Sequence, residues 1–119
     1  MRVLACGSRS WTDMDAIREA FDGLDEVPTE VIHGGARGAD YLAGLVARER
    51  GIKVLVYPAQ WDLHGKSAGF KRNQKMVDSG VQLVLAFHAD NSPGTADTIR
   101  RAREAGIEVR IFTPRPEAA

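Results

Sequence analysis

The sequence predicts one three-layer α/β/α sandwich, in which helices cover both faces of a mostly parallel five-stranded sheet of order 3-2-1-4-5. Short apolar runs of strand type alternate with helix-patterned segments along the whole chain, and this alternation is typical of a parallel sheet. The connections are short, and right-handed crossovers bring the carboxyl ends of all strands to one rim. A chain of 119 residues has the size of one domain, so we expect a single domain over residues 1–119.

The first half of the chain is expected to contain three strands and two helices. The strands are expected over residues 2–6, 30–33 and 52–57, where apolar residues run together. The first helix is expected after a cap at Thr12 or Asp13, because apolar residues recur at helical spacing through residues 17–24. The second follows the glycine-rich stretch 33–40 and ends at Gly51. The run 52–57 is almost continuously apolar, which predicts a strand covered on both faces.

The second half is expected to contain a long loop, two helices and two strands. Residues 58–69 are too polar and glycine-rich for a regular element, and a long loop in so small a chain is often functional. Helices are expected over about residues 70–79 and 96–105, and strands over 81–87 and 107–112. The last strand alternates apolar with charged residues, which favours an edge position. The proline-rich tail from Thr113 is expected to be frayed.

The composition argues against several classes of protein. Lys plus Arg and Asp plus Glu number 16 each, so the net charge of zero does not suit a protein that coats nucleic acid. Cys6 has no partner and lies in the first apolar run, which predicts a buried thiol in a reducing compartment. The chain has no membrane-length apolar run and no secretion-type N-terminus, and its three histidines lack the spacing of a metal site. We therefore expect a cytoplasmic protein that binds no metal and requires no cofactor.

The stretch from His33 to Asp40 is the strongest candidate for a ligand site. Its three glycines stand where a strand passes into a helix, and glycine lets a ligand approach backbone N–H groups closely. A helix start offers unpaired donors and a positive dipole end, so a phosphate is the expected ligand. A tight turn without any ligand is the simpler alternative. Asp40 would either cap the helix or accept a hydrogen bond from a ribose hydroxyl. The candidate binding residues here are His33, Gly34, Gly35, Arg37, Gly38 and Asp40.

Further stretches supply candidate binding residues at the same rim. The turn at residues 7–9 adds a guanidinium that would grip a phosphate, unless Arg9 is simply solvated. Trp61 would stack on a base or pack against the protein, and packing is slightly favoured. The Gly-Lys-Ser at 65–67 is not a Walker A motif, because no strand runs directly into it. The cations near the helix start that follows would cost stability unless an anion compensates them. The candidates from these stretches are Gly7, Ser8, Arg9, Trp61, Lys66, Gly69, Arg72, Asn73, Gly94 and Thr95.

In order and spacing, these motifs resemble the small YspA-like members of the SLOG superfamily. The matching stretches are residues 33–40, 58–61, 65–69 with 72–73, and 94–95. The resemblance implies a Rossmann-like fold that binds nucleotides or nucleotide-derived ligands. Relatives include the cytokinin-activating phosphoribohydrolases, DNA-uptake proteins of the DprA type, and sensor domains for ADP-ribose-like signals in bacterial and phage conflict systems.

The resemblance also implies candidate catalytic residues. In the phosphoribohydrolases, an Arg-Lys pair and a Gly-Gly-x-Gly-Thr-x-x-Glu loop carry catalysis and phosphate binding. Arg72 matches the arginine, with Asn73 in place of the lysine, and residues 94–95 match the Gly-Thr pair. Thr98 stands at the glutamate position, and Asp97 is one residue away. Arg72 and Asp97 are therefore the candidate catalytic residues.

The departures from that loop favour binding over catalysis. The double glycine reads Asn91-Ser92 here, and an uncharged threonine does not stabilise the cationic sugar of glycosidic cleavage. We therefore expect a protein that binds a nucleotide or an ADP-ribose-like ligand, as a sensor or a sequestering protein. The alternative is a nucleoside-monophosphate phosphoribohydrolase in which Asp97 or Asp40 helps the departing sugar, and a weaker alternative is single-stranded DNA binding. The expected partners are a small nucleotide ligand and further copies of the chain in a dimer or higher homo-oligomer, with no membrane and no nucleic acid.

Overall fold

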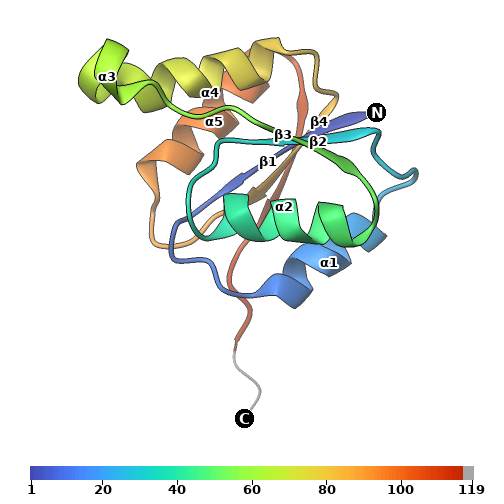
Figure 1. Ribbon diagram of the computed structural model, residues 1–119. Helices are drawn as coiled ribbons and strands as arrows, with labels where there is room; N and C mark the ends of the chain where they lie inside the picture. Colours follow the sequence, from blue (N-terminus) through green and yellow to red (C-terminus); the bar gives the residue numbers. More distant parts are fainter. Residues whose placement is uncertain (117–119) are drawn as a thin grey trace.

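A computed structural model describes residues 1–116 of the chain (Figure 1). Its strands are β1 (Arg2–Gly7), β2 (Glu30–His33), β3 (Lys53–Val56), β4 (Leu83–Phe87) and β5 (Glu108–Phe112). Its helices are α1 (Met14–Asp22), α2 (Ala39–Glu49), α3 (Trp61–His64), α4 (Ala68–Asp78) and α5 (Pro93–Glu104), with a short 3₁₀ turn, η1 (Gly65–Ser67), between α3 and α4.

The strands form one all-parallel sheet in the order β3-β2-β1-β4-β5, which confirms the predicted fold class and strand order. Helices α1 and α2 cover one face of the sheet, and α4 and α5 cover the other (Figure 1). Alternate residues of the central strand β1 enter the two cores: Val3 and Ala5 face α1 and α2, whereas Leu4 and Cys6 face α4 and α5. Cys6 is buried, as expected. Because every strand runs the same way, the loops after β1, β2, β3 and β4 meet at one rim.

Several details differ from the sequence-based expectations. The expectation that β3 is covered on both faces is wrong: Lys53 and Val56 are exposed, because β3 lies at the end of the sheet, where the helices cover it only in part. Residues 58–69 are not all loop, since α3, η1 and the first two residues of α4 lie within them. Helix α5 begins at Pro93, three residues earlier than expected, because the Ser92 hydroxyl caps it and proline suits a first turn. Of the two possible caps of α1, the structure uses Asp13.

The C-terminal tail is tied to the domain as far as it is described. The Arg115 guanidinium donates to the carboxylates of Asp13 and Glu19, so this part of the tail is not frayed as the sequence predicted. Residues 117–119 of the predicted tail lie outside the described residues. Between residues 1 and 116, none of the helices has the length and apolar character that a membrane crossing requires.

Candidate functional site

Two pockets lie next to each other at the carboxyl-terminal rim and share part of their walls. The β1 pocket, of about 530 Å³, lies between the β1–α1 loop and the β4–α5 loop. The Trp61 pocket, of about 550 Å³, lies between the glycine-rich loop after β2 and the start of α3. Arg9, Ala36 and Arg72 line both pockets. The strand order reverses between β1 and β4, which is where ligands bind in open parallel sheets.

The glycine-rich loop uses its own backbone donors internally. The N–H groups of Gly34 and Ala36 donate to Asp40 Oδ2 at 3.0 and 3.3 Å, and the N–H of Gly35 donates to His33 Nδ1 at 2.9 Å. Both accepting side chains are buried. Asp40 therefore holds the loop rather than capping α2, whose N-cap is Gly38 without a side-chain hydrogen bond. A ligand at this loop meets side chains rather than these three amides.

Two glycines of the loop are required by close packing. A Cβ on Gly34 would lie 2.4 Å from Arg72 Nη1 and 2.7 Å from its Cζ. Gly38 has a φ of +77°, and a Cβ there would lie 2.4 to 2.6 Å from the backbone of Ser8 and Arg9. The first glycine makes room for the Arg72 guanidinium, and the second lets α2 begin directly against the β1–α1 loop.

The Arg72 guanidinium is fixed on two sides and free on the third. Its Nη1 donates to the carbonyls of Gly34 at 2.6 Å and Tyr57 at 3.3 Å, and its Nε donates to Asn73 Oδ1 at 3.0 Å. Nη2 has no hydrogen-bond partner among the described residues, and this atom is not fully buried. Burial lowers the pKa of Arg72 while the charge of Asp40 raises it, and an arginine stays charged throughout. Arg72 thus presents one edge of a rigid cation where the two pockets meet.

Asn73 connects α4 to α5 and orients Arg72. Its Nδ2 donates to the Gly94 carbonyl at 3.3 Å and to Asp97 Oδ2 at 3.1 Å, while its Oδ1 accepts the bond from Arg72. The Asp97 carboxylate also accepts from Arg101 at 2.7 Å and from Arg100 at 2.9 Å, and it lines neither pocket. Burial raises the pKa of Asp97, but its hydrogen bonds outweigh burial and the net pKa is lowered. A catalytic role of Asp97 stays a prediction, and its contacts are those of a structural link.

The loop before α5 forms one wall of the β1 pocket. Asp90 and Asn91 have φ values of 54° and 50°, a conformation that Asp and Asn tolerate better than most residues. Asn91 thus takes a glycine-like backbone at the position where the phosphoribohydrolases have glycine. Ser8 Oγ donates to the Ala89 carbonyl at 2.5 Å and accepts from the Ala89 N–H at 2.7 Å, which ties this loop to the β1–α1 loop. Gly7, Gly94, Thr95 and Thr98 also line the pocket.

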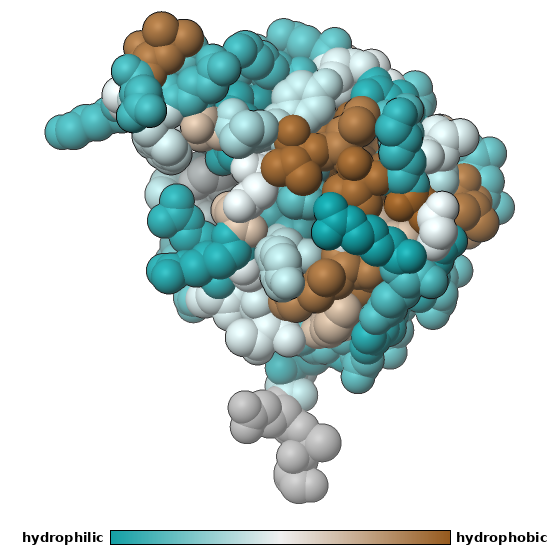
Figure 2. All heavy atoms as spheres, viewed as in Figure 1, coloured by the Kyte–Doolittle hydropathy of each residue, from teal (hydrophilic) through white to brown (hydrophobic). Residues whose placement is uncertain are grey.

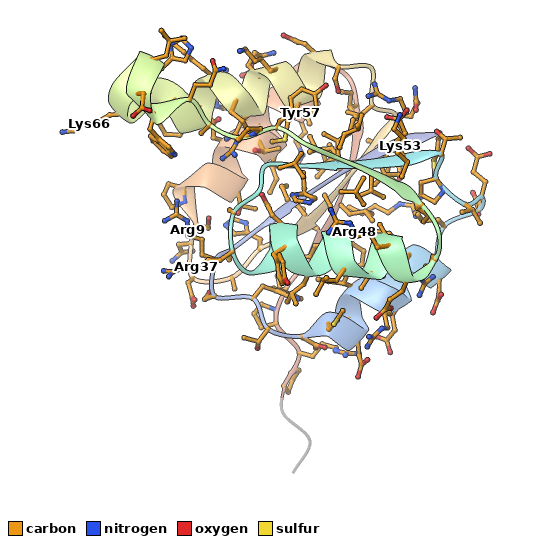
Figure 3. All side chains as sticks on the ribbon, viewed as in Figure 1. Arg9, Arg37, Arg48, Lys53, Tyr57 and Lys66 are labelled. Atoms are coloured by element: carbon orange, nitrogen blue, oxygen red, sulfur yellow. The ribbon has the colours of Figure 1, made fainter. Side chains whose placement is uncertain are left out.

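Trp61 is the first residue of α3, and α3 and η1 form an arm that extends beyond the body of the domain (Figure 1). Its side chain is 53% exposed, so the expectation that it packs into the protein is wrong; α3 has no buried residue. The indole lies near Gly69, where a Cβ would be 3.5 Å from the ring. Lys66 projects from the arm (Figure 3) and lines neither pocket.

Positive charge is concentrated at the pockets although the net charge of the chain is zero. Arg9 and Arg37 lie near each other on neighbouring loops (Figure 3). Both are exposed, and neither forms a hydrogen bond through its side chain or an ion pair within residues 1–116. With Arg72 they place three guanidinium groups around the Trp61 pocket. Figure 2 shows a mostly hydrophilic surface over these loops, with hydrophobic residues gathered over α2 and β3. The rim is therefore suited to an anionic ligand.

Burial sets the protonation of the groups beneath the loop. Burial raises the pKa of Asp40 to about 6, although the N–H of Ala36, the charge of Arg72 and the N–H of Gly34 oppose this rise. Burial, with the charges of Arg48 and Arg72, lowers the pKa of His33. Because Nδ1 accepts the Gly35 N–H, the ring proton lies on Nε2. Burial raises the pKa of the Cys6 thiol and keeps it protonated. In the described part of the chain, no three His, Cys, Asp or Glu side chains are arranged to hold a metal ion.

Comparisons with known proteins agree with this architecture. A family model described as "YspA, cpYpsA-related SLOG family" matches residues 1–64. The chain is 42% identical over 123 residues to the Gene 61 protein of Mycobacterium phage D29, covering 97% of this chain and 98% of the phage protein. The chain belongs to the YspA-related SLOG family.

A solved structure extends the comparison to the fold. The chain is similar to DNA processing protein A (DprA) from Streptococcus pneumoniae, with a TM-score of 0.76 and 19% identity over 92% of this chain. It spans 49% of the length of that protein. The likeness shows a shared Rossmann-like fold, and the expectation of such a fold is confirmed.

Proposed function

We propose that this chain binds a nucleotide or a nucleotide-derived, ADP-ribose-like ligand at the carboxyl-terminal rim, as a sensor or a sequestering protein. The observation that carries the proposal is the free edge of Arg72 at the junction of the two pockets. A guanidinium held in one orientation binds a phosphate by paired hydrogen bonds without losing further side-chain freedom. Membership of the SLOG family supports a nucleotide-related ligand.

The paired pockets suit a ligand with a phosphate-containing centre and two ends. Arg9 and Arg72 line both pockets and stand between them, where a phosphate or diphosphate would bind. For ADP-ribose, the exposed indole of Trp61 offers a stacking surface for the base at one end of the diphosphate. The hydroxyl and carboxylate groups of Thr95, Thr98 and Asp40 offer polar contacts in the other pocket for the terminal ribose of ADP-ribose, or for the ribose of AMP. Each pocket has a volume typical of small-molecule sites.

The test compares phosphorylated and unphosphorylated ligands by calorimetry. AMP and ADP-ribose are expected to bind the unaltered protein, and Arg72→Ala is expected to weaken both by at least about tenfold, because a charge-assisted hydrogen bond contributes about 1.5 to 3 kcal/mol. Adenosine binding should change much less. Arg103→Ala is the matched control, since Arg103 is exposed near the other end of α5, about 14 Å along the helix from Gly94. If Arg72→Ala weakens adenosine as strongly as AMP, Arg72 does not bind the phosphate.

Hydrolysis of an N-glycosidic bond is the second candidate function, and Asp40 is the observation that favours it. A buried carboxyl group with a pKa of about 6 lines the β1 pocket, and raised carboxyl pKa values are characteristic of acid catalysts. Under this alternative Asp40, rather than Asp97, would donate its proton to the departing base. Release of free adenine from AMP, followed by chromatography, distinguishes this enzyme from a binding protein.

A further inference from the structure

The Asp40 carboxylate has one oxygen committed to the protein and one that is free. Oδ2 accepts the N–H groups of Gly34 and Ala36. Oδ1 accepts no hydrogen bond from the described residues, and this atom is not fully buried. The side chain is only 6% exposed and lines the β1 pocket. A buried carboxylate with an unpaired oxygen therefore opens into the pocket, an arrangement that is costly without a donor.

The partner that Oδ1 requires is a neutral hydrogen-bond donor. A phosphate is excluded from this position, because two anionic oxygens at hydrogen-bonding distance would repel each other. The charged groups around Asp40 are Arg72 on α4 and Arg9 on the β1–α1 loop. The Cys6 thiol on β1 is also near, and it is protonated and therefore uncharged. Neither arginine forms a hydrogen bond to the carboxylate. A ligand that displaces solvent from this pocket must therefore supply the donor.

The distance between Asp40 and Arg72 restricts what that donor can be. A Cβ built on Gly34 would lie 3.0 Å from Asp40 Oδ2 and 2.4 Å from Arg72 Nη1, so the Asp40 carboxylate and the Arg72 guanidinium both lie beside Gly34. In a nucleotide, the hydroxyl groups of the sugar are the donors nearest to a phosphate, and the base lies farther away. The hydroxyls of Thr95 and Thr98, which line the same pocket, donate within the protein to Ser92 and to the Gly94 carbonyl.

We propose that Asp40 Oδ1 accepts a hydrogen bond from a ribose hydroxyl, so that the site selects ribonucleotides over deoxyribonucleotides. The inference rests on the proposed function, because it assumes that the phosphate lies at Arg72. Asp40 then has two roles: Oδ2 holds the glycine-rich loop, and Oδ1 distinguishes ribose from deoxyribose. A site that hydrogen-bonds a hydroxyl rejects the analogue without it, because the buried acceptor is then left unpaired.

The experiment measures the affinities of AMP, 2′-deoxy-AMP and 3′-deoxy-AMP by calorimetry at about pH 8, where Asp40 is ionised. The unaltered protein should bind AMP at least tenfold more tightly than one of the two deoxy compounds. Asp40→Asn separates the two roles, because its amide oxygen can still accept the N–H groups of the loop while its NH₂ replaces Oδ1 in the pocket. This variant should lose most of the preference for the hydroxyl. A purely structural role of Asp40 would weaken all three ligands equally and leave the ratio unchanged.

Asp78→Asn is the matched control, since Asp78 is exposed at the far end of α4 and lines neither pocket. It should leave the ratio of affinities unchanged. The inference is overturned if the three compounds bind the unaltered protein equally, or if Asp40→Asn keeps the preference. In both cases the binding of AMP leaves the proposed function intact. Failure of AMP and of ADP-ribose to bind at all would overturn the proposed function, and this inference with it.

Discussion

Replacing Asp40 with asparagine should change how the stability of the ligand-free protein depends on pH. The pKa of Asp40 is raised by burial from 3.8 to about 6. The folded protein therefore holds this proton more tightly than the unfolded chain, so the contribution of Asp40 to stability is fully present below about pH 4 and is lost as the pH rises through about 6. Each unit of pKa corresponds to about 1.4 kcal/mol, so the loss amounts to about 3 kcal/mol.

The contribution of Asp40 is measured as the difference in the free energy of unfolding between two proteins. The free energy of unfolding in urea is measured for the unaltered protein and for Asp40→Asn at several values from about pH 4 to about pH 8. Asparagine does not titrate, so the difference between the two proteins isolates Asp40 whatever the constant cost of the substitution. Asp40→Asn should gain about 3 kcal/mol relative to the unaltered protein over this range. A difference that stays constant within about 0.5 kcal/mol would refute the account of Asp40 as a buried and poorly compensated carboxylate.

Asp97→Asn is the control of opposite sign. The pKa of Asp97 is lowered, since hydrogen bonds from Arg101, Asn73 and Arg100 outweigh the effect of burial. Its contribution is present above the unfolded pKa and is lost as the pH falls through the folded pKa. The difference between the unaltered protein and this variant should therefore shrink towards acid.

Three further predictions concern the ligand. Gly34→Ala should weaken AMP binding at least about tenfold, because its Cβ would lie 2.4 Å from Arg72 Nη1 and displace the guanidinium; Gly23→Ala, whose Cβ would meet nothing closer than 3.6 Å, should leave affinity unchanged. Trp61→Ala should weaken ADP-ribose by roughly fivefold to a hundredfold if its base stacks there, but should leave pyrophosphate binding and folding unchanged. The unaltered protein should release adenine from AMP undetectably or very slowly, and a gain of hydrolysis in Thr98→Glu, measured by chromatography, would show that the remaining groups are arranged for that chemistry. Fast release by the unaltered protein would contradict the assignment as a binding protein.

The fold could be predicted because its signals are local and repeated. Alternating strand and helix patterns fixed the fold class, and the crossover rule placed the glycine-rich loops at one rim. The features that the sequence predicted wrongly are those whose burial depends on tertiary contacts. The apolar run that became β3 resembles a central strand, yet its exposure depends on its position in the sheet, which no single strand encodes. Trp61 lies on a four-residue helix that has no buried residue, and its hydrophobicity alone gives no indication of this.

The site could be predicted as a set of residues but not as a set of contacts. Arg72, Asn73 and Asp40 were all singled out, and the structure brings them together around Gly34. The sequence gives no sign that Asp40 and His33 take up the loop amides, because these bonds depend on how the loop bends. The hydrogen bond from Ser10 to Asp90, which joins two loops of the β1 pocket, spans 80 residues and had no local signal.

The expected homo-oligomer stays a prediction, and light scattering of the purified chain checks it. Val56 on the edge strand β3 and Trp61 are both exposed hydrophobic residues, so a copy of the chain covering this side would compete with the ligand. A mass that falls on addition of AMP would show such competition.

The central claim is that Arg72 holds the phosphate of a nucleotide where the two pockets meet. Nuclear magnetic resonance of the labelled protein during titration with ADP-ribose tests it most directly, because the Nε–H of Arg72 and the backbone amides of the rim are observed separately. The account predicts that the largest shift changes occur at Arg72, Arg9 and Ala36, which line both pockets, while Lys53, at the start of β3 and away from the rim, stays unchanged. Shifts confined to residues away from the rim, or no shifts at millimolar ADP-ribose and AMP, would contradict it.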